Sequence, residues 1–304
     1  EIEKVGVFTP KIKYIDSLMP GEIGFITAGI KKVADCKIGD TLTDAVKPSS
    51  KALPGFKPSQ PVVFCGLFPY DSSQFNDFKD SLEKLSLNDS SFSYEQESSA
   101  ALGQGFRCGF LGLLHMEVIR ERLEREFNIE LMTTAPSVVY EIETTDNKIK
   151  TIQNPIEFPD PNLIKNMKEP WINSTIIVPQ SYLGSVFELC ESRRGKQISH
   201  TFTGKTVIVK YKLPLSETII DFYDRLKSIT QGYASFDYQI DENKDSKLIK
   251  LSILVNQEIV EPLSIIVHAS HAEQRGREIC KRLKEVLPRQ QFKLPIQAAI
   301  GGKI

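Results

Sequence analysis

The chain has 304 residues, of which 40% are hydrophobic and 25% are charged, and its formal net charge is −1. These values are typical of a soluble globular protein with two or three domains, and they exclude a uniformly basic coat for nucleic acid. Any contact with nucleic acid must therefore use local patches of positive charge.

The five cysteines are dispersed and form no Cys-x-x-Cys pair; they are Cys36, Cys65, Cys108, Cys190 and Cys280. This pattern predicts reduced, mostly buried thiols in a cytosolic type of compartment. No apolar run approaches the roughly 20 residues that span a bilayer, and no signal peptide opens the chain. The chain starts without Met and stops in an apolar stretch, so we interpret it as a fragment.

Residues 1–46 alternate apolar and polar side chains as β-strands do, with a turn at Met19-Pro20-Gly21. Strands are expected at 23–30 and 38–42, which together predict the closing strands of a small β-barrel. Residues 47–61 carry four prolines and one glycine. Because proline restricts φ and lacks an amide donor, this stretch is predicted to be an extended linker between domains.

Residues 62–144 are predicted to form a ferredoxin-like βαββαβ module. The expected elements, in chain order, are a strand at Val62–Leu67, a helix at Ser72–Leu85, strands at Ser91–Glu97 and Leu102–Leu111, a helix at Leu113–Phe127 and a strand at Glu130–Glu143. Asp71 or Ser72 is expected to cap the first helix. The glycines around Cys108 are expected to allow close packing, and the prolines in 145–168 predict a second linker.

Residues 169–243 repeat the order of elements without repeating the sequence, which predicts a second ferredoxin-like module. Its helices are expected at Tyr182–Arg193 and Ser216–Ser228. Residues 247–304 begin with an alternating strand and continue with a strand near Leu263–His268, a basic helix at about Glu273–Val286 and an incomplete apolar segment. The predicted fold class is therefore α+β: a partial β-barrel, two ferredoxin-like sandwich modules and a truncated α+β C-terminal domain.

No convincing catalytic motif is present. The phosphate-binding pattern GxxxxGK[ST] is absent, and Asn243-Lys244-Asp245 only echoes a guanine-reading motif, so a polar turn is the favoured interpretation. Cys108 and His115 could be a nucleophile and its base, but burial as core residues is favoured. His268 and His271 lack a third metal ligand.

Two carboxylates, Glu95 and Glu97, alternate on one predicted strand. Paired carboxylates can perform acid–base chemistry, but at this spacing they more often belong to a solvated sheet face. We therefore predict no catalytic residue, no metal site and no cofactor site in this chain.

Basic residues are the more informative group. Arg193, Arg194 and Lys196 lie where the first helix of the second module is expected to end, and they either complement the helix dipole or contact phosphate. Residues 275–303 hold eight basic against two acidic side chains, a local charge of +6. Such a density favours a polyanionic partner. The predicted RNA contacts are Arg193, Arg194, Lys196, Arg275, Arg277, Lys281, Arg282, Arg289 and Lys303.

Several stretches resemble the LepA-type elongation factor 4 family of translational GTPases. The matching stretches are Lys51–Lys57, Gly66–Pro69, Leu85–Asp89, Gly105–Glu117, Thr133–Pro136, Asp221–Lys227, Gly232–Ser235, Arg275–Glu278 and Pro288–Phe292. Elongation factor G shares this architecture but has a further domain between its two ferredoxin-like modules. The resemblance therefore implies domains II, III and V of the family followed by the start of its own C-terminal domain.

The resemblance implies a monomeric protein that binds the ribosome through ribosomal RNA and possibly tRNA, but not DNA. It implies back-translocation, translational fidelity or ribosome assembly under stress as the process, with GTP and magnesium bound by a GTPase domain missing from this chain. The expected location is the cytoplasm, possibly at the inner membrane as a peripheral protein, or an organellar matrix. The alternative is a stand-alone RNA-binding or ribosome assembly protein without GTPase activity.

Overall fold

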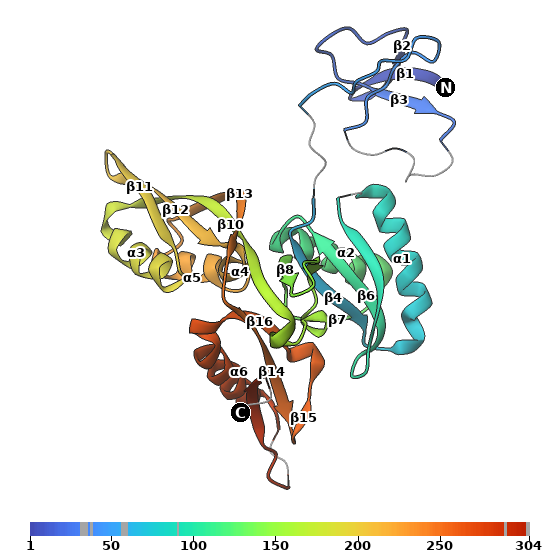
Figure 1. Cartoon of the computed structure of the whole chain (residues 1–304). Helices are drawn as coiled ribbons and strands as arrows, with labels where there is room; N and C mark the ends of the chain where they lie inside the picture. The colour runs from blue at the N-terminus through green and yellow to red at the C-terminus, as the bar shows by residue number, and fades with distance from the viewer. Residues whose placement is uncertain (31–35, 37–38, 56–59, 90, 289–290, 302–304) are drawn as a thin grey trace. The chain divides into compact units, whose positions relative to one another are not determined.

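The computed structural model describes residues 1–304 except 31–35, 37–38, 56–59, 90, 289–290 and 302–304 (Figure 1). It divides into two compact units, one of Glu1–Ser59 with Leu87–Ser90 and one of Gln60–Ser86 with Ser91–Ile304. Helices and mostly antiparallel sheets alternate along the chain, which confirms the α+β class.

The first unit contains an open three-stranded antiparallel sheet, ordered β2-β1-β3. Its strands are β1 (Ile2–Thr9), β2 (Lys11–Ile15) and β3 (Phe25–Ala28). The strand expected at 38–42 is not formed by its described residues, and Ile38 lies outside them. Gly6 alone is buried among the described residues of this unit, and these residues contain no closed barrel.

The second unit starts with a four-stranded antiparallel sheet ordered β5-β6-β4-β7, which is the ferredoxin-like arrangement. Its elements are β4 (Val63–Pro69), α1 (Phe75–Asn88), β5 (Ser93–Ser99), β6 (Gly103–Phe110), α2 (Leu113–Phe127) and β7 (Leu131–Thr133). Asp71 accepts a hydrogen bond of 2.9 Å from the Ser73 amide and so caps the short 3-10 turn before α1. Both helices pack on one sheet face around Leu67, Phe106 and Cys108.

The glycines of β4 and β6 make room for aromatic rings on the other face of this sheet. A Cβ atom at Gly105 would lie 2.4 Å from the Leu67 carbonyl oxygen and 2.5 Å from the Phe68 ring. A Cβ at Gly109 would lie 2.6 Å from the Phe64 ring. The expectation that these glycines permit close packing therefore has a specific basis, since the rings lie directly over the glycine backbone.

The strand expected at Glu130–Glu143 is two separate strands. β7 ends at Thr133, and β8 (Tyr140–Thr144) pairs instead with β9 (Ile149–Ile152) and with the start of β10 (Ile164–Pro179). Pro136 lies between them and cannot donate to a strand ladder. The predicted linker 145–168 thus contains β9 and the first residues of β10. The apolar side chain of Ile152, in β9, is buried in the core of the second module.

The second module is built around the long strand β10, which pairs with β12 and β13 along its length. Its remaining elements are α3 (Leu183–Ser192), β11 (Lys196–Thr203), β12 (Thr206–Pro214), α4 (Leu215–Thr218), α5 (Phe222–Ile229) and β13 (Ser235–Asp245). The helix expected at Ser216–Ser228 is broken into α4 and α5. At the break, the Asp221 carboxylate binds Arg193 and Arg225 and makes no cap hydrogen bond to α5.

The C-terminal part contains a sheet in which β14 (Leu248–Val255) pairs with all other strands. These strands are β15 (Glu258–Ile259), β16 (Ile265–His268) and β17 (Ile296–Ile300). The helix α6 (Ala272–Val286) packs on β14 and β17, and a Cβ at Gly276 would lie only 2.9 Å from the Ala298 Cβ. The incomplete apolar segment of the prediction is thus strand β17.

Candidate functional site

Seven ionisable side chains form one contiguous cluster in the second unit, which we call the charge cluster. Its members are Glu169, Arg193, Arg194, Glu217, Asp221, His271 and Arg275. They come from β10, the end of α3, α4, the residue before α5 and the start of α6. The cluster therefore joins the second module to the C-terminal part.

Glu169 is fully buried, and each of its oxygens has a partner. Arg194 donates to it in a bidentate manner, at 2.6 Å from Nη1 and 3.0 Å from Nη2, and the Ser216 hydroxyl donates at 2.9 Å. Arg194 has φ = 59°, a left-handed conformation that non-glycine residues rarely adopt. The bidentate contact is a sufficient reason for this conformation to persist.

Glu217 is the carboxylate on which most of the cluster converges. It is 6% exposed and accepts from Arg194 Nε at 3.1 Å and from His271 Nδ1 at 3.0 Å. Burial alone would raise its pKa, but the positive charge of Arg194 together with His271 and Arg275 holds the pKa of Glu217 below its ordinary value. The carboxylate is therefore ionised at neutral pH.

The remaining arginines of the cluster also face carboxylates. Arg193 is 5% exposed and donates to Asp221 Oδ1 at 2.7 Å. Arg275 lies 3.7–3.9 Å from Glu217, Asp221 and Glu278. Arg193, Arg194 and Arg275, which the sequence predicted as RNA contacts, thus each face carboxylates of the protein itself. Their contact with RNA stays a prediction.

Four other predicted RNA contacts, namely Lys196, Arg277, Lys281 and Arg282, lie at the surface. Arg277 is exposed and pairs with Glu273 at 2.6 Å within α6. Lys281, Arg282 and Lys284 are exposed on the same helix, and within the described part of the chain no ion pair involves them. Lys196 is exposed and lies over the Trp171 ring at 5.7 Å. Arg289 and Lys303 fall outside the described residues.

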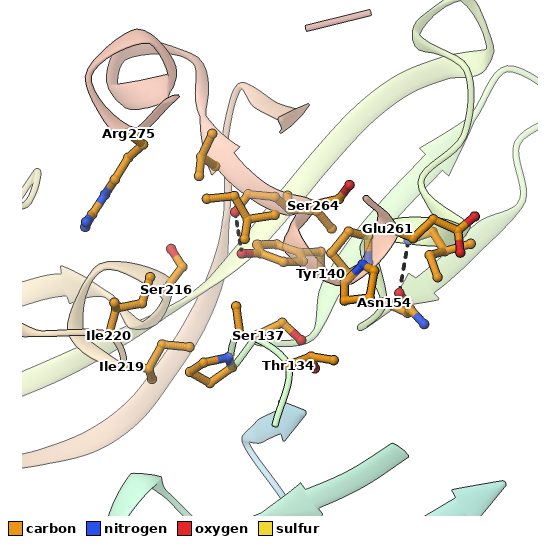
Figure 2. A pocket seen from close by; sticks show the side chains of 18 of the residues that line it. Thr134, Ser137, Tyr140, Asn154, Ser216, Ile219, Ile220, Glu261, Ser264 and Arg275 are labelled. Carbon is orange, nitrogen blue, oxygen red and sulfur yellow. Dashed lines mark hydrogen bonds between the residues drawn. The ribbon is translucent and has the colours of Figure 1, made fainter. Parts of the chain in front are cut away.

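A pocket lies where the first module, the second module and the C-terminal part meet within the second unit. Figure 2 shows Tyr140 between Ser137 and Ser264, with Ile219 and Ile220 on another side. The Tyr140 hydroxyl donates to the Ile266 carbonyl at 3.4 Å. Long-range tertiary contacts therefore build this pocket.

Two charged side chains of the first module line one end of the pocket. Arg107 donates from Nη2 to the Ser137 hydroxyl at 2.6 Å and to the Gln153 carbonyl, and Glu97 accepts from Asn154. Burial raises the pKa of Glu97 and lowers the pKa of Arg107, because both charged forms lose hydration. The sequence predicted that Glu95 and Glu97 both belong to a solvated sheet face. In the structure Glu95 is exposed, whereas Glu97 is half-buried.

The side chains of the other candidate pairs have separate hydrogen-bond partners, although the rings of His268 and His271 lie 6.4 Å apart. Cys108 is fully buried, burial raises the pKa of its thiol, and His115 Nδ1 instead accepts from the Leu111 amide at 3.1 Å. His268 contacts Ser270, whereas His271 contacts Glu217. No cluster of metal-binding side chains occurs in the described ranges.

Asn243-Lys244-Asp245 belongs to the end of β13, so its interpretation as a polar turn is wrong. Backbone pairing with β10 extends to Lys168↔Asp245 and holds these polar residues in a strand. Among the described helices, none is both long enough and apolar enough to cross a membrane.

Local sequence signals found the basic residues but missed the carboxylates that bind them. Glu169 is the single acidic residue of β10, and Glu217 is the single acidic residue of the short helix α4. The apolar residues Trp171 and Ile172 close after Glu169 are the one sequence signal that could have indicated a buried carboxylate at this position.

Two family models match adjacent parts of the chain. Residues 166–253 match the elongation factor G C-terminus, and residues 255–304 match the C-terminus of the GTP-binding protein LepA. The first match covers the second ferredoxin-like module and most of β14, and the second covers β15, β16, α6 and β17. The matches agree with the resemblance seen in the sequence, and they support the assignment of this chain to the C-terminal region of an elongation factor 4 (LepA-type) translational GTPase.

Proposed function

We propose that this chain binds the ribosome and that the outward side of α6 supplies its main contact with RNA. The single observation that carries the proposal is the exposed basic surface formed by Arg277, Lys281, Arg282 and Lys284. Translation elongation factors act on the ribosome, whose surface is rich in RNA phosphate. Arginine and lysine side chains suit phosphate because they provide positive charge and several donors.

The charge cluster supports this proposal by separating the basic residues into two roles. Arg275 and His271 point from the start of α6 toward Glu217, whereas Lys281 and Lys284 are exposed further along the same helix. The ion pairs at the start of α6 anchor the helix on the second module. In this proposal, Arg193 and Arg194 position α6, and RNA contact belongs to the exposed residues.

The proposal extends to GTP-dependent action in back-translocation, translational fidelity or ribosome assembly under stress. GTP and magnesium would bind to a GTPase domain of the same family rather than to the residues described above. The protein would then act in the cytoplasm or an organellar matrix, with tRNA near its C-terminal part. A peripheral association with the inner membrane would use the same basic surface.

Ribosome binding tests the proposal when it is measured over a range of salt concentrations. Replacing Lys281, Arg282 and Lys284 together by Ala should weaken binding and reduce the slope of log K against log salt. Each lost phosphate contact changes that slope by roughly 0.7 to 0.9. The loss of three such contacts should therefore change the slope by roughly 2 to 3 in total.

A matched control replaces three other exposed lysines, Lys79, Lys84 and Lys150, by Ala. It removes the same charge from surfaces far along the chain from α6. The control variant should keep the salt slope of the unchanged protein. An unchanged slope in the α6 variant, or an equal loss in both variants, would contradict the assignment of RNA contact to α6.

A further inference from the structure

Strand β11 is an exposed edge of the sheet in the second module. It pairs with β12 along one side, and no strand within the described part of the chain pairs with its other side (Figure 1). All eight of its residues, Lys196–Thr203, are exposed. Since backbone groups alternate between the two sides of a strand, about half of its N–H and C=O groups face solvent in a row that another strand could continue.

The composition of β11 does little to protect this edge. Edge strands of soluble proteins are usually very short or carry charges, which prevents pairing with other chains. Here no Lys, Arg, Asp or Glu lies between Lys196 and Lys205, and Ile198 and Phe202 are 51% and 52% exposed. One register shift near the start of the strand leaves residues 199–203 in regular register with β12. The edge is therefore open to a further strand.

One face of this edge is apolar. His200 and Phe202 lie opposite two fully buried valines of β12, so they extend the core face of the sheet to its rim. The rings of Phe187 and Phe202 lie 6.0 and 5.6 Å from the ring of His200. This aromatic row is partly open to solvent, so an apolar side chain of a neighbouring strand would pack on it.

The other face is basic near β11. Lys196 lies directly opposite Lys212 on β12. Lys210 shares this face with Lys212, is exposed, and has no ion pair among the described residues. The acidic residues of the same face, Asp237 and Asp241, belong to β13 on the far side of β10. Like charges directly opposite each other destabilise a strand pair, so an acidic side chain beside these lysines would be favourable.

We propose that β11 binds an extended peptide segment of a partner protein, which adds a strand to this sheet. The segment alternates apolar and acidic residues. Its apolar side chains pack on the row of His200 and Phe202, and its carboxylates face Lys196 and Lys210. Backbone hydrogen bonds supply affinity, and the two different faces supply specificity. The site uses other residues than the RNA contact assigned to α6 and is independent of it.

Two other occupants fit these features less well. RNA could place phosphates near the lysines, but it would leave the row of backbone N–H and C=O groups without a strand partner. A second copy of this chain, pairing through its own β11, would offer no carboxylate to the lysines, because β11 contains none. An acidic peptide segment matches the backbone, the apolar row and the charge together.

The test follows hydrogen–deuterium exchange of the whole chain with the acetylated and amidated heptapeptide EVEFEVE. Amide exchange in Lys196–Thr203 should slow in a saturable manner as the peptide concentration rises. Exchange in β13, which also pairs along one side only, should not change. The charge-reversed peptide KVKFKVK should bind at least roughly tenfold more weakly at low salt, because it meets lysines.

Two N-methylated forms of EVEFEVE distinguish strand addition from general adhesion. Alternate amides of a strand point to opposite sides, so only one alternating set can donate to β11. N-methylation of that set should abolish binding, whereas N-methylation of the other set should leave the affinity within about twofold. Adhesion through charge or apolar contact alone would treat both forms equally.

Variants of the chain locate the contacts. Lys196→Glu combined with Lys210→Glu should weaken binding of EVEFEVE by roughly tenfold at low salt, and Phe202→Ser by roughly fivefold. Matched controls carry the same changes at exposed positions elsewhere in the chain, namely Lys79→Glu with Lys84→Glu and Phe292→Ser. The controls should bind as the unchanged chain does, and an unchanged melting temperature shows that each variant is folded.

Three results would overturn the proposal. One is exchange in β11 that stays the same at every concentration of EVEFEVE. The second is equal binding of the two N-methylated forms. The third is another occupant: stronger protection of β11 by an oligouridine RNA than by the peptide, or protection that rises with the concentration of the chain alone.

Discussion

Replacing Glu217 by Gln removes the negative charge on which the cations of the charge cluster converge. The side chain keeps its volume, so the change tests charge rather than packing. Arg194 keeps its bidentate contact with Glu169, and Arg193 keeps Asp221. His271, by contrast, loses the carboxylate that it contacts, and Arg275 loses one of the two carboxylates that it faces on the second module and keeps Asp221.

The expected cost follows from this division. Removing one partner of a buried ion pair typically costs about 3–5 kcal/mol, because an uncompensated charge stays buried. Here Arg193 and Arg194, two of the four cations, keep their hydrogen-bonded carboxylates, and the amide oxygen of the new Gln side chain can still accept a hydrogen bond. The free energy of unfolding should therefore fall by about 2–3 kcal/mol. The free energy of unfolding from urea titration measures it, and hydrogen exchange should show faster opening of α6.

The pH dependence has a definite sign. The pKa of Glu217 lies below its ordinary value because of Arg194, His271 and Arg275. Its stabilising contribution is therefore complete above the pKa that it has in the unfolded chain, and it is lost as the pH falls through the lower pKa of the folded state. Glu217→Gln should remove this part of the acid dependence.

Glu273→Gln is the matched control, because Glu273 pairs with Arg277 on the same helix but both side chains are about four-fifths exposed. Exposed ion pairs contribute little to stability, so this variant should unfold nearly as the unchanged protein does. The reasoning about the charge cluster fails if both variants are equally stable. It also fails if hydrogen exchange of α6 is the same in both.

Two further predictions concern the first module. Gly105→Ala should cost about 1–3 kcal/mol of unfolding free energy, because its Cβ would lie 2.4 Å from the Leu67 carbonyl oxygen, whereas Gly184→Ala has open space and should not destabilise. A Gly105→Ala variant as stable as Gly184→Ala would contradict this packing. In the folded chain, a thiol reagent followed by mass spectrometry should modify Cys36 first and leave Cys65 and Cys108 unmodified, since Cys36 is exposed and burial raises the pKa of Cys65 to about 12. Early modification of Cys65 would show that the strand pair β4–β6 opens.

The sequence allowed the order of elements to be predicted where local signals agree with the tertiary structure. The helix expected at Leu113–Phe127 is observed with the same bounds, because its apolar side chains recur at helical spacing. The prediction of one continuous strand at Glu130–Glu143 was wrong, because β-propensity does not show which sheet a strand joins. β8 leaves the first sheet and pairs with β10, a partner some 20 residues later in the chain.

The charge cluster could not be predicted for a related reason. Arg193 and Arg194 attracted attention as adjacent cations, but their partners lie 23–28 residues away and on other elements. Charge density along a sequence does not distinguish a cation that meets water from one that meets a buried carboxylate. The pocket is similar, since Glu97, Arg107 and Ser264 come together only after three parts of the chain have packed.

The charge cluster also joins the two regions that the family models match. Glu169, Arg194 and Glu217 lie within residues 166–253, whereas His271 and Arg275 lie within residues 255–304. A network of buried ion pairs tolerates few alternative geometries, because each charge left without a partner is costly. We therefore infer that the cluster favours one orientation of α6 on the second module. Arg275 faces the second module at the start of the helix. Lys281 and Lys284 follow it by six and nine residues, which turns them to other sides of the helix, and both are exposed.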